Sequence, residues 1–333
     1  MAGPILSLVL PIYDEEAIIP ELDRRLRAFL ADVGSGVGEA WEVIFVNDGS
    51  KDRSLALLSA LCVAEPRYKV ISLSRNFGHQ MAITAGLDRA GGEAVVVMDA
   101  DLQDPPEVVR EMVARWREGF DVVFGVRAQR HGETAFKRLT AAVFYRLLRA
   151  MLGGVAIPVD AGDFRLLSRS VVLTLRALRE RHRFVRGLVW WVGFRQTSVA
   201  YDRPARFAGE TKFPLRRMLH FAVDGITSFS TIPLRMATWL GVLAGLAALG
   251  GVGWALYSKF FGGVVRGWTT IMILVGLGSS AQLLMTGILG EYVGRIYEEV
   301  KRRPLYVVEG EINLPALEAA QAARDARASA TAK

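Results

Sequence analysis

The sequence predicts an α/β protein with a mostly parallel sheet, followed by two long apolar helices. Short apolar stretches alternate with helical stretches up to Gly125, which is the pattern of parallel strands joined by helices. Two uncharged, mostly apolar runs then occupy residues 236–258 and 267–290, and each exceeds the roughly 20 residues that cross a bilayer core as a helix. We therefore expect a sheet domain joined to a transmembrane hairpin.

Each predicted strand ends in polar residues. The strands are expected at Leu6–Pro11, Glu42–Val46, Lys69–Leu73, Val95–Met98 and Val122–Gly125. Amphipathic or mixed stretches between them predict helices that end near Ala31, cover Asp52–Ala64 and end at Asp88. Because ligands bind at the carboxyl ends of strands in such sheets, the polar residues after the strands are the candidate site.

The fourth strand ends in a pair of aspartates. Val95–Met98 is bounded by Gly91-Gly92 and by Pro105-Pro106, as expected of a strand buried on both faces. Asp99 and Asp101 are two residues apart, so in extended backbone both carboxylates point to the same side. Two close carboxylates repel unless a cation lies between them, and Mg²⁺ or Mn²⁺ prefers such oxygen ligands. Gln103 would add a third oxygen; the alternative is a solvated acidic loop that caps the helix beginning at Pro105.

Several other functions are disfavoured by what the sequence lacks. No G-x-G-x-x-G follows the first strand and there is no Walker loop, which argues against a dinucleotide enzyme or an NTPase. The net charge is +7, but no nucleic-acid recognition motif accompanies it, so no nucleic-acid partner is expected. A bound nucleotide would have to be held by groups such as Asp48 and the turn at Asp14-Glu15.

Basic residues flank the two apolar runs on one side. The connecting loop has only Lys259 and Arg266, whereas more basic residues precede the first run and follow the second: Arg216, Arg217, Arg235, Arg295, Lys301, Arg302 and Arg303. The positive-inside rule then predicts that both termini are cytoplasmic. Residues 213–229 carry apolar side chains on one helical face, which predicts an amphipathic helix at the inner leaflet; the alternative is a core helix of the sheet domain.

Five ordered motifs resemble those of the inverting family 2 glycosyltransferases. They are P-I-Y-D-E-E at 11–16, V-N-D-G-S-K-D at 46–52, S-R-N-F-G-H-Q at 74–80, D-A-D-L-Q-D-P-P at 99–106 and A-G-D-F-R-L-L at 161–167. The chain looks most like the polyprenyl-phosphate branch, which includes dolichol-phosphate mannose synthases and bacterial bactoprenol glucosyltransferases. The resemblance implies a GT-A fold with a Rossmann-like sheet. It also implies that Asp99, Asp101 and Gln103 hold the metal.

The resemblance implies further site residues. The residues expected at the nucleotide sugar are Pro11, Tyr13, Glu15, Asp48, Arg75, Asp99 and Asp101. A catalytic carboxylate is implied within residues 160–165, where Asp163 is favoured over Asp160 and Arg165 accompanies it. A phosphate acceptor is already ionised near pH 7, so a strong base is hardly needed, and the expected role of Asp163 is then to position groups or tune Arg165. The alternative is that Asp163 caps the helix expected near Ser168.

An anionic acceptor needs cations near the attacked carbon. Two basic groups flank the expected site, and guanidinium groups suit phosphate oxygens. The candidates for binding a lipid phosphate are Arg127, Arg130, Lys137, Arg138, Arg203, Arg206 and Lys212.

The sequence therefore predicts a metal-dependent enzyme of a bacterial cytoplasmic membrane. It would transfer a sugar, with glucose from UDP-glucose as the first choice, to undecaprenyl or another polyprenyl phosphate, and relatives suggest a homo-oligomer. The expected organisation is a catalytic domain at 1–210, juxtamembrane helices at 211–235, two transmembrane helices within 236–292 and a cytoplasmic tail at 293–333. Alternatives are another donor such as GDP-mannose, a processive polysaccharide synthase, or a flippase-type subunit.

Overall fold

The computed structural model describes residues 4–37, 40–127, 161–181, 183–202, 232–261 and 268–314. The chain forms two compact units. The first consists of Met1–Ala141, Ala156–Lys212 and Pro304–Lys333, and the second of Ala142–Val155 and Phe213–Arg303. The sheet and the candidate site belong to the first unit.

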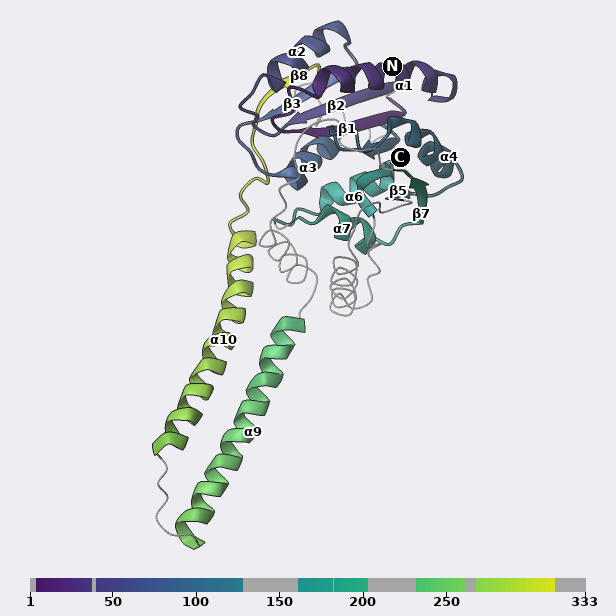
Figure 1. The fold of residues 1–333 in the computed structure, drawn as a ribbon. Helices are drawn as coiled ribbons and strands as arrows, with labels where there is room; N and C mark the ends of the chain where they lie inside the picture. Colours follow the sequence, from purple (N-terminus) through teal and green to yellow (C-terminus); the bar gives the residue numbers. More distant parts are fainter. Residues whose placement is uncertain are drawn as a thin grey trace, which may run out of the picture. The chain divides into compact units, whose positions relative to one another are not determined.

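The first unit is built on a mixed sheet with the strand order β7-β5-β6-β4-β1-β2-β3-β8 (Figure 1). Its central strands are parallel, as the sequence predicts: β1 pairs with both β2 and β4, and β2 pairs with β3. These strands cover Leu6–Ile12 (β1), Trp41–Asn47 (β2), Tyr68–Leu73 (β3) and Ala94–Val97 (β4). The remaining strands are Val122–Arg127 (β5), Ala161–Ser168 (β6), Gln196–Tyr201 (β7) and Val308–Ile312 (β8).

Two antiparallel strands were not predicted from the sequence. Strand β6 lies between β4 and β5 and is antiparallel to both. Its register pairs Val97 with Arg165, so continuing the register by two residues brings Asp163 opposite Asp99. Strand β8 pairs antiparallel with β3 at the other edge. Residues 160–165, expected before a helix, therefore lie largely within a strand.

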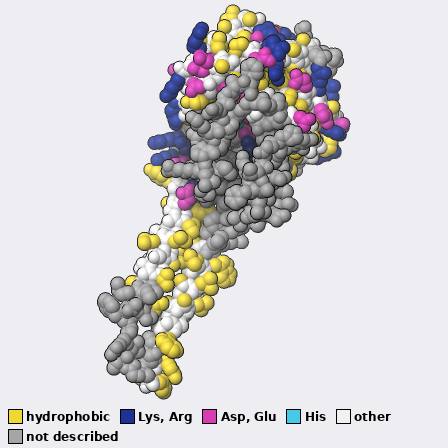
Figure 2. Space-filling view, in the orientation of Figure 1, with side chains coloured by type: hydrophobic (Ala, Val, Ile, Leu, Met, Phe, Trp, Pro, Cys, Tyr) yellow, Lys and Arg dark blue, Asp and Glu magenta, His cyan; other side chains and the backbone are white. Residues whose placement is uncertain are grey.

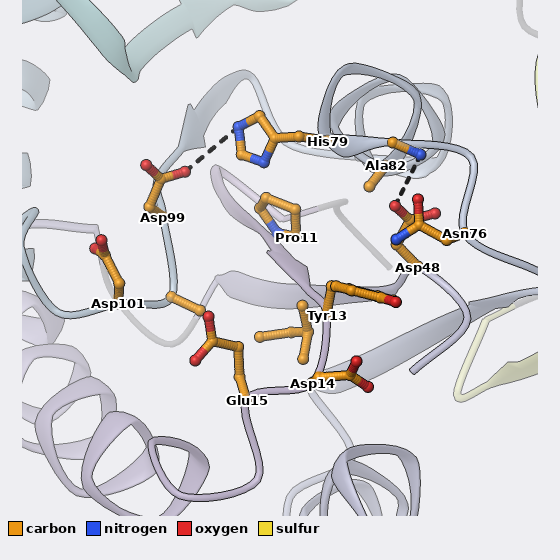
Figure 3. A pocket seen from close by; sticks show the side chains of 13 residues that line it. Pro11, Tyr13, Asp14, Glu15, Asp48, Asn76, His79, Ala82, Asp99 and Asp101 are labelled. Atoms are coloured by element: carbon orange, nitrogen blue, oxygen red, sulfur yellow. Dashed lines mark hydrogen bonds and ion pairs between the residues drawn. The ribbon is translucent and has the colours of Figure 1, made fainter. Parts of the chain in front are cut away.

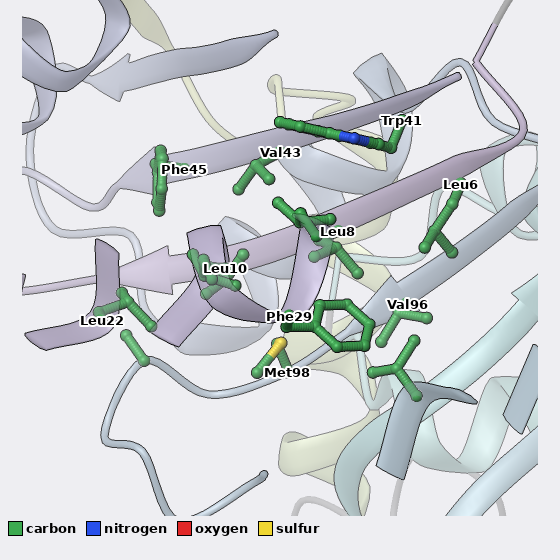
Figure 4. Packing of buried hydrophobic residues seen from close by; sticks show 14 of the residues in the cluster. Leu6, Leu8, Leu10, Leu22, Phe29, Trp41, Val43, Phe45, Val96 and Met98 are labelled. Carbon is green, nitrogen blue, oxygen red and sulfur yellow. The ribbon is translucent and has the colours of Figure 1, made fainter. Parts of the chain in front are cut away.

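Helices cover the sheet on both faces. The described helices of this unit are α1 (Ile19–Val37), α2 (Ser54–Ala64), α3 (His79–Arg89), the short 3₁₀ helix η1 (Pro106–Val108), α4 (Val109–Arg117), α6 (Arg169–Ala177) and α7 (Val185–Trp191). Alternating residues of β1 face opposite sides. Leu8 and Leu10 pack in one cluster with Leu22 and Phe29 of α1 (Figure 4), whereas Val9 faces α3.

Helix α3 packs unusually close to the sheet. A Cβ atom added at Gly86 would lie 2.2 Å from Val9 Cγ1, so glycine allows this contact between α3 and β1. The carboxyl end of α3 is also fixed, because the Arg176 guanidinium donates hydrogen bonds to the carbonyl oxygens of Leu87 and Ala90. The first residue of α3, His79, is thus carried by a firmly anchored helix.

The chain returns to the sheet near its end. Residues 304–314 were expected in a tail, but β8 completes the sheet edge beside β3. Asn313 Nδ2 donates to the carbonyl oxygens of Cys62 and Tyr68 at 2.8 and 2.9 Å. Glu311 forms an ion pair with Arg89, and Tyr306 Oη donates to Asp88 Oδ2 at 2.7 Å. The last described strand is therefore bonded to the sheet and to the end of α3.

The second unit contains two long helices that lie side by side (Figure 1), α9 (Ile232–Phe261) and α10 (Trp268–Val300). They are antiparallel, since Gly241 lies near Met285 and Gly251 near Leu274. Figure 2 shows hydrophobic side chains along these helices, and several are well exposed, including Trp239, Leu246, Trp254, Leu277 and Leu283.

The transmembrane assignment of these helices is not supported. Within the part of the chain that the structure describes, no helix combines the length and the apolar character that a membrane span requires. The expected spans at 236–258 and 267–290 are thus confirmed as helices but not as a transmembrane hairpin. The amphipathic helix expected at 213–229 lies outside the described residues.

Candidate functional site

A cavity of about 520 Å³ opens where the central parallel strands end (Figure 3). It lies at the carboxyl ends of β1, β2, β3 and β4, where the sequence analysis placed the site. Its lining residues come from the segments that follow these strands: Pro11, Ile12, Tyr13, Asp14, Glu15, Asp48, Asn76, Gly78, His79, Ala82, Asp99, Ala100 and Asp101. Six of the seven residues predicted at the nucleotide sugar are therefore brought together; Arg75 is not among them.

The turn after β1 forms one wall of the cavity. Asp14 has a φ of 51°, which turns the chain sharply, and hydrogen bonds to the segment after β2 hold the turn in place. The amide of Glu15 donates to Ser54 Oγ at 3.0 Å, and Asp14 Oδ1 accepts the amide N–H of Lys51 at 2.7 Å. These bonds explain how Tyr13 and Glu15 are presented at the cavity.

Asp48 fixes the loop that follows β3. Its two carboxylate oxygens accept the amide N–H groups of Phe77 and Gly78 at 2.7 and 2.9 Å. Burial raises the pKa of Asp48, and these two hydrogen bonds offset part of that rise. Asp48 lines the cavity as predicted, but in this structure its carboxylate supports the protein's own backbone.

Arg75 lies on the same loop but has other contacts. Its guanidinium carbon is 4.0 Å from the centre of the Phe77 ring, and it donates to the carbonyl oxygen of Asn76 at 3.0 Å. Gly49 allows the loop to approach, because a Cβ there would lie 2.4 Å from the carbonyl carbon of Arg75. Arg75 therefore shapes the loop at the rim instead of lining the cavity.

Asp99 and Asp101 reach the cavity from a turn, not from extended strand. Strand β4 ends at Val97, and Leu102 has a φ of 59°. The Asp101 carboxylate accepts the amide N–H of Gln103 at 3.1 Å. The prediction that both carboxylates face one site is correct, but the turn brings this about. Gln103 itself does not line the cavity.

The Asp99 carboxylate suits a cation. Its Oδ1 atom is buried and accepts no hydrogen bond from the described residues. Burial raises the pKa of Asp99 to about 6, and the nearby carboxylates of Asp104, Asp163 and Asp101 add to this rise. Among the described residues, no group of three His, Cys, Asp or Glu side chains is arranged to hold a metal ion. Asp99 and Asp101 both line the cavity, and carboxylate oxygens are ligands that Mg²⁺ or Mn²⁺ prefers.

Asp163 is the centre of a cationic cluster beside Asp99. It lies on β6 and is 5% exposed. The Arg186 guanidinium donates Nε to Asp163 Oδ1 at 2.9 Å and Nη2 to Oδ2 at 2.8 Å, which is a bidentate pair. His79 Nε2 lies 3.3 Å from Oδ2, and Arg165 Nη2 lies 3.6 Å from Oδ1. The cap alternative is excluded, since Ser168 precedes helix α6.

The charges in this cluster make Asp163 a weak base. Burial alone would raise the pKa of Asp163, but hydrogen bonds from Arg186 and His79 and the charge of Arg165 hold it well below the usual range of a carboxyl. Burial lowers the pKa of Arg165 to about 10, so this guanidinium remains charged at neutral pH. A carboxylate with so low a pKa accepts protons poorly.

Sequence reasoning missed three members of this site. The sequence analysis assigned no role to His79. Burial lowers the pKa of His79, but the hydrogen bond to Asp163 and the charge of Asp99 raise it overall. Gln80 Nε2 lies 3.4 Å from Asp163 Oδ2, and its Oε1 accepts the amide N–H of Val185. Both residues stand in the S-R-N-F-G-H-Q motif, which was a usable signal. Arg186 stands in none of the five motifs.

The remaining predicted site residues cannot be placed. Asp160 and the basic residues Arg130, Lys137, Arg138, Arg203, Arg206 and Lys212 lie outside the described residues. Arg127 ends strand β5, but its side chain is likewise outside the description. The predicted phosphate-binding role of these residues stays a prediction.

Comparisons with known proteins identify the family of this chain. The model of glycosyl transferase family 2 matches residues 7–176, which contain β1 to β6 and the whole cavity. The uncharacterized glycosyltransferase YkcC of Bacillus subtilis is 50% identical over 91% of this chain and 93% of its own. The prophage bactoprenol glucosyl transferase homolog of Escherichia coli is 39% identical, over 91% of this chain and 98% of its own.

One further relative and one solved structure are also similar to this chain. The bactoprenol glucosyl transferase of Shigella phage SfII is 40% identical over 91% of this chain and 97% of its own. A solved structure, the mannosyltransferase PcManGT of Pyrobaculum calidifontis in complex with GDP-Man and Mn²⁺, covers 86% of this chain and 88% of its own at 18% identity and a TM-score of 0.43. The mixed α/β sheet is consistent with a GT-A fold. From the family match and the curated relatives, the chain belongs to glycosyl transferase family 2.

Proposed function

We propose that this enzyme transfers a hexose from a nucleotide diphosphate sugar to a polyprenyl phosphate, with inversion at the anomeric carbon. The observation that carries the proposal is the pairing of an acidic cavity with a cationic cluster beside it. Asp99 and Asp101 lie in the cavity, and Asp163 with Arg186 and Arg165 lies next to Asp99. Relatives that are named bactoprenol glucosyl transferases support a polyprenyl phosphate as the acceptor. UDP-glucose is the first donor to test.

The cavity residues hold the donor. Pro11 and Tyr13 offer flat surfaces for the base, and Asp48 keeps the loop of residues 74–78 against it. Asp99 and Asp101, with Gln103 as a further candidate, would hold Mg²⁺ or Mn²⁺. When bound, that cation supplies positive charge that stabilises the departing diphosphate. The orphaned Oδ1 of Asp99 is the feature that favours this use.

The reaction is a single displacement. An oxygen of the acceptor phosphate attacks the anomeric carbon from the face opposite the diphosphate, and the bond from that carbon to the diphosphate breaks. The leaving nucleoside diphosphate keeps the electron pair. A phosphate monoester has a second pKa near 6, so its oxygen needs no base to remove a proton at pH 7. Asp163 therefore holds Arg186 and Arg165 in place, and inversion follows from the one-step geometry.

The acceptor is a lipid, so we place the reaction at the cytoplasmic face of a bacterial membrane. The large hydrophobic side chains exposed along α9 and α10 support contact with lipid. The homo-oligomer expected from relatives stays a prediction. Flotation with liposomes tests the lipid contact: the purified protein is expected to rise with the vesicles, and its recovery at the bottom of the gradient would contradict this placement.

The direct test is a transfer assay. The purified protein is incubated with a short-chain polyprenyl phosphate, Mn²⁺ or Mg²⁺ and radiolabelled UDP- or GDP-sugars, each separately. Label is expected in the organic phase with one donor and is lost when a chelator is added. Nuclear magnetic resonance of the product then gives the anomeric configuration. If every donor fails while UDP or GDP still binds, the lipid acceptor is wrong and a processive synthase becomes the better assignment.

The pH dependence should follow the acceptor and not Asp163. In the folded protein the pKa of Asp163 lies well below 3.8, so its carboxylate stays ionised from pH 5 to 9. The stability that this carboxylate contributes is lost as the pH falls toward its pKa in the folded protein. With saturating donor, the rate is expected to fall below about pH 6, where the acceptor phosphate gains a proton. Replacing the phosphate of the acceptor by a phosphonate of higher pKa should raise the pH at which the rate falls. If that pH does not change, a group of the enzyme titrates instead.

A further inference from the structure

One imidazole nitrogen lies between two carboxylates of the site. His79 Nε2 is 3.5 Å from Asp99 Oδ1 and 3.3 Å from Asp163 Oδ2. A single ring nitrogen carries at most one hydrogen, so it cannot give a full hydrogen bond to both oxygens. Figure 3 shows the ring of His79 turned toward Asp99 across the cavity. One ring nitrogen therefore faces both carboxylates.

The two carboxylates differ in how much they depend on His79. Asp163 is held independently by the bidentate pair with Arg186, and Gln80 and Arg165 lie close to it. Asp99 has no such support: within the described residues, its Oδ1 atom accepts no hydrogen bond and pairs with no basic side chain other than His79. The Asp99 oxygen that would meet a cation is thus the one that His79 faces.

The position of His79 is fixed by the fold. It is the first residue of α3, which contacts β1 through Gly86 and whose far end is bonded to Arg176, Arg179 and Tyr306. Asp99, in contrast, follows the end of β4 in a turn. The backbone of His79 is therefore held by an anchored helix, whereas Asp99 stands in a turn.

We propose that His79 is a positioning residue that competes with the divalent cation for Asp99 and serves Asp163 once the donor is bound. The proposal rests on the proposed function, since it concerns the same site. In the empty enzyme His79 holds Asp99 Oδ1 in the cavity. When the cation takes that oxygen, the Nε2 hydrogen is left to Asp163 Oδ2 alone, which fixes Asp163 and the Arg186 bound to it for the transfer step.

This role predicts opposite effects on binding and on turnover. Without His79, no side chain competes for Asp99, so Mn²⁺ should bind more tightly, by up to about five-fold for a half-exposed pair. Turnover should fall about ten-fold, since Asp163 loses a donor that holds it. A merely structural residue would weaken both together. In His79→Gln the side-chain amide keeps an N–H donor at similar reach, so both values should return toward those of the wild type.

The experiment measures binding and transfer separately. Mn²⁺ is titrated calorimetrically into wild type, His79→Ala, His79→Gln and Asp101→Asn, each saturated with UDP or, in parallel, with GDP. Asp101→Asn is the matched control, because it changes the other candidate carboxylate ligand and leaves His79 in place, and it should weaken Mn²⁺ binding. Turnover of all four proteins is then measured at saturating donor and acceptor.

The outcomes separate the two proposals. Tighter Mn²⁺ binding with slower turnover in His79→Ala, both reversed in His79→Gln, supports the role of His79. Weaker Mn²⁺ binding in His79→Ala, as in Asp101→Asn, or unchanged values in both assays would overturn it. If the wild type transfers no sugar to polyprenyl phosphate, the proposed function fails, while the Mn²⁺ titrations still decide whether His79 competes for Asp99. His79→Gln also decides the matter if His79→Ala fails to fold.

Discussion

Replacing Asp101 by alanine is expected to reduce the rate of sugar transfer at least about 100-fold. The Asp101 side chain lines the cavity from the turn after β4, and with Asp99 it forms the pair of carboxylates that suits a cation. Without it, Asp99 alone would have to hold the cation against the leaving diphosphate. The rate is measured as label transferred to polyprenyl phosphate, and Mn²⁺ binding is measured in the presence of the nucleoside diphosphate.

The matched control for this change is Glu107→Gln. Glu107 is an exposed carboxylate in η1, six residues further along the same segment, and it does not line the cavity. Its replacement should leave both transfer and Mn²⁺ binding near the wild-type values. If Asp101→Ala keeps more than about a tenth of the wild-type rate, a cation held by the two aspartates cannot be central to catalysis.

The second large effect is expected on stability, when Asp163 is replaced by alanine. Removing one partner of a buried ion pair leaves the other charge unpaired, at a cost of about 3–5 kcal/mol. Here two guanidinium groups lose their carboxylate: Arg165, which is 3% exposed, and Arg186. The free energy of unfolding, measured in urea by circular dichroism, should fall by about this amount.

An acidic residue in a surface ion pair provides the comparison. Glu21 of α1 pairs with Arg24 and Arg25 at the surface, where solvent screens the charges. Glu21→Ala should therefore leave the urea midpoint almost unchanged. A loss of less than about 1 kcal/mol in Asp163→Ala would mean that Arg165 and Arg186 find other partners, and the view that Asp163 holds them in place would have to be abandoned.

The parallel centre of the sheet could be predicted because its strands carry a local signal. Val95–Met98 is uninterruptedly apolar between glycines and prolines, and the strand found there is Ala94–Val97. The same holds for β1, β2 and β3, whose predicted ends differ from the observed ends by one residue at most. Polar residues directly after these strands identified most of the cavity, since strand direction alone brings them to one edge.

The antiparallel strands gave no such signal. Strand β6 carries Asp163 and Arg165 at buried positions, where a sequence pattern predicts apolar residues, and the two charges are stable there because they lie beside each other and Arg186. Strand β8 contains two glutamates and begins 235 residues after the end of β3, the strand with which it pairs. The meeting of His79, Asp163 and Arg186 likewise depends on contacts between distant segments.

The apolar runs show what a hydropathy pattern can and cannot establish. It correctly predicted long helices around residues 236–258 and 267–290, since nothing in either run interrupts a helix. The same pattern does not determine what surrounds a helix, because small residues such as glycine and serine are neither strongly apolar nor strongly polar. The step from helix to transmembrane span was the part that the structure did not support.

Strand β8 returns the chain to the first unit, which is therefore built from segments that precede and follow the helix pair. The chain leaves this unit after Lys212, forms the helix pair, and re-enters at Pro304, so the helices are an insertion tethered at both ends and not an appendage. A shortened protein that stops before α9 would lack β8, leave the edge of β3 bare, and lose the bonds from Glu311 and Asn313. An unpaired strand edge invites pairing between molecules. A truncation that ends before α9 would therefore promote aggregation, whereas a shortened protein that retains residues 304–314 would keep the edge covered.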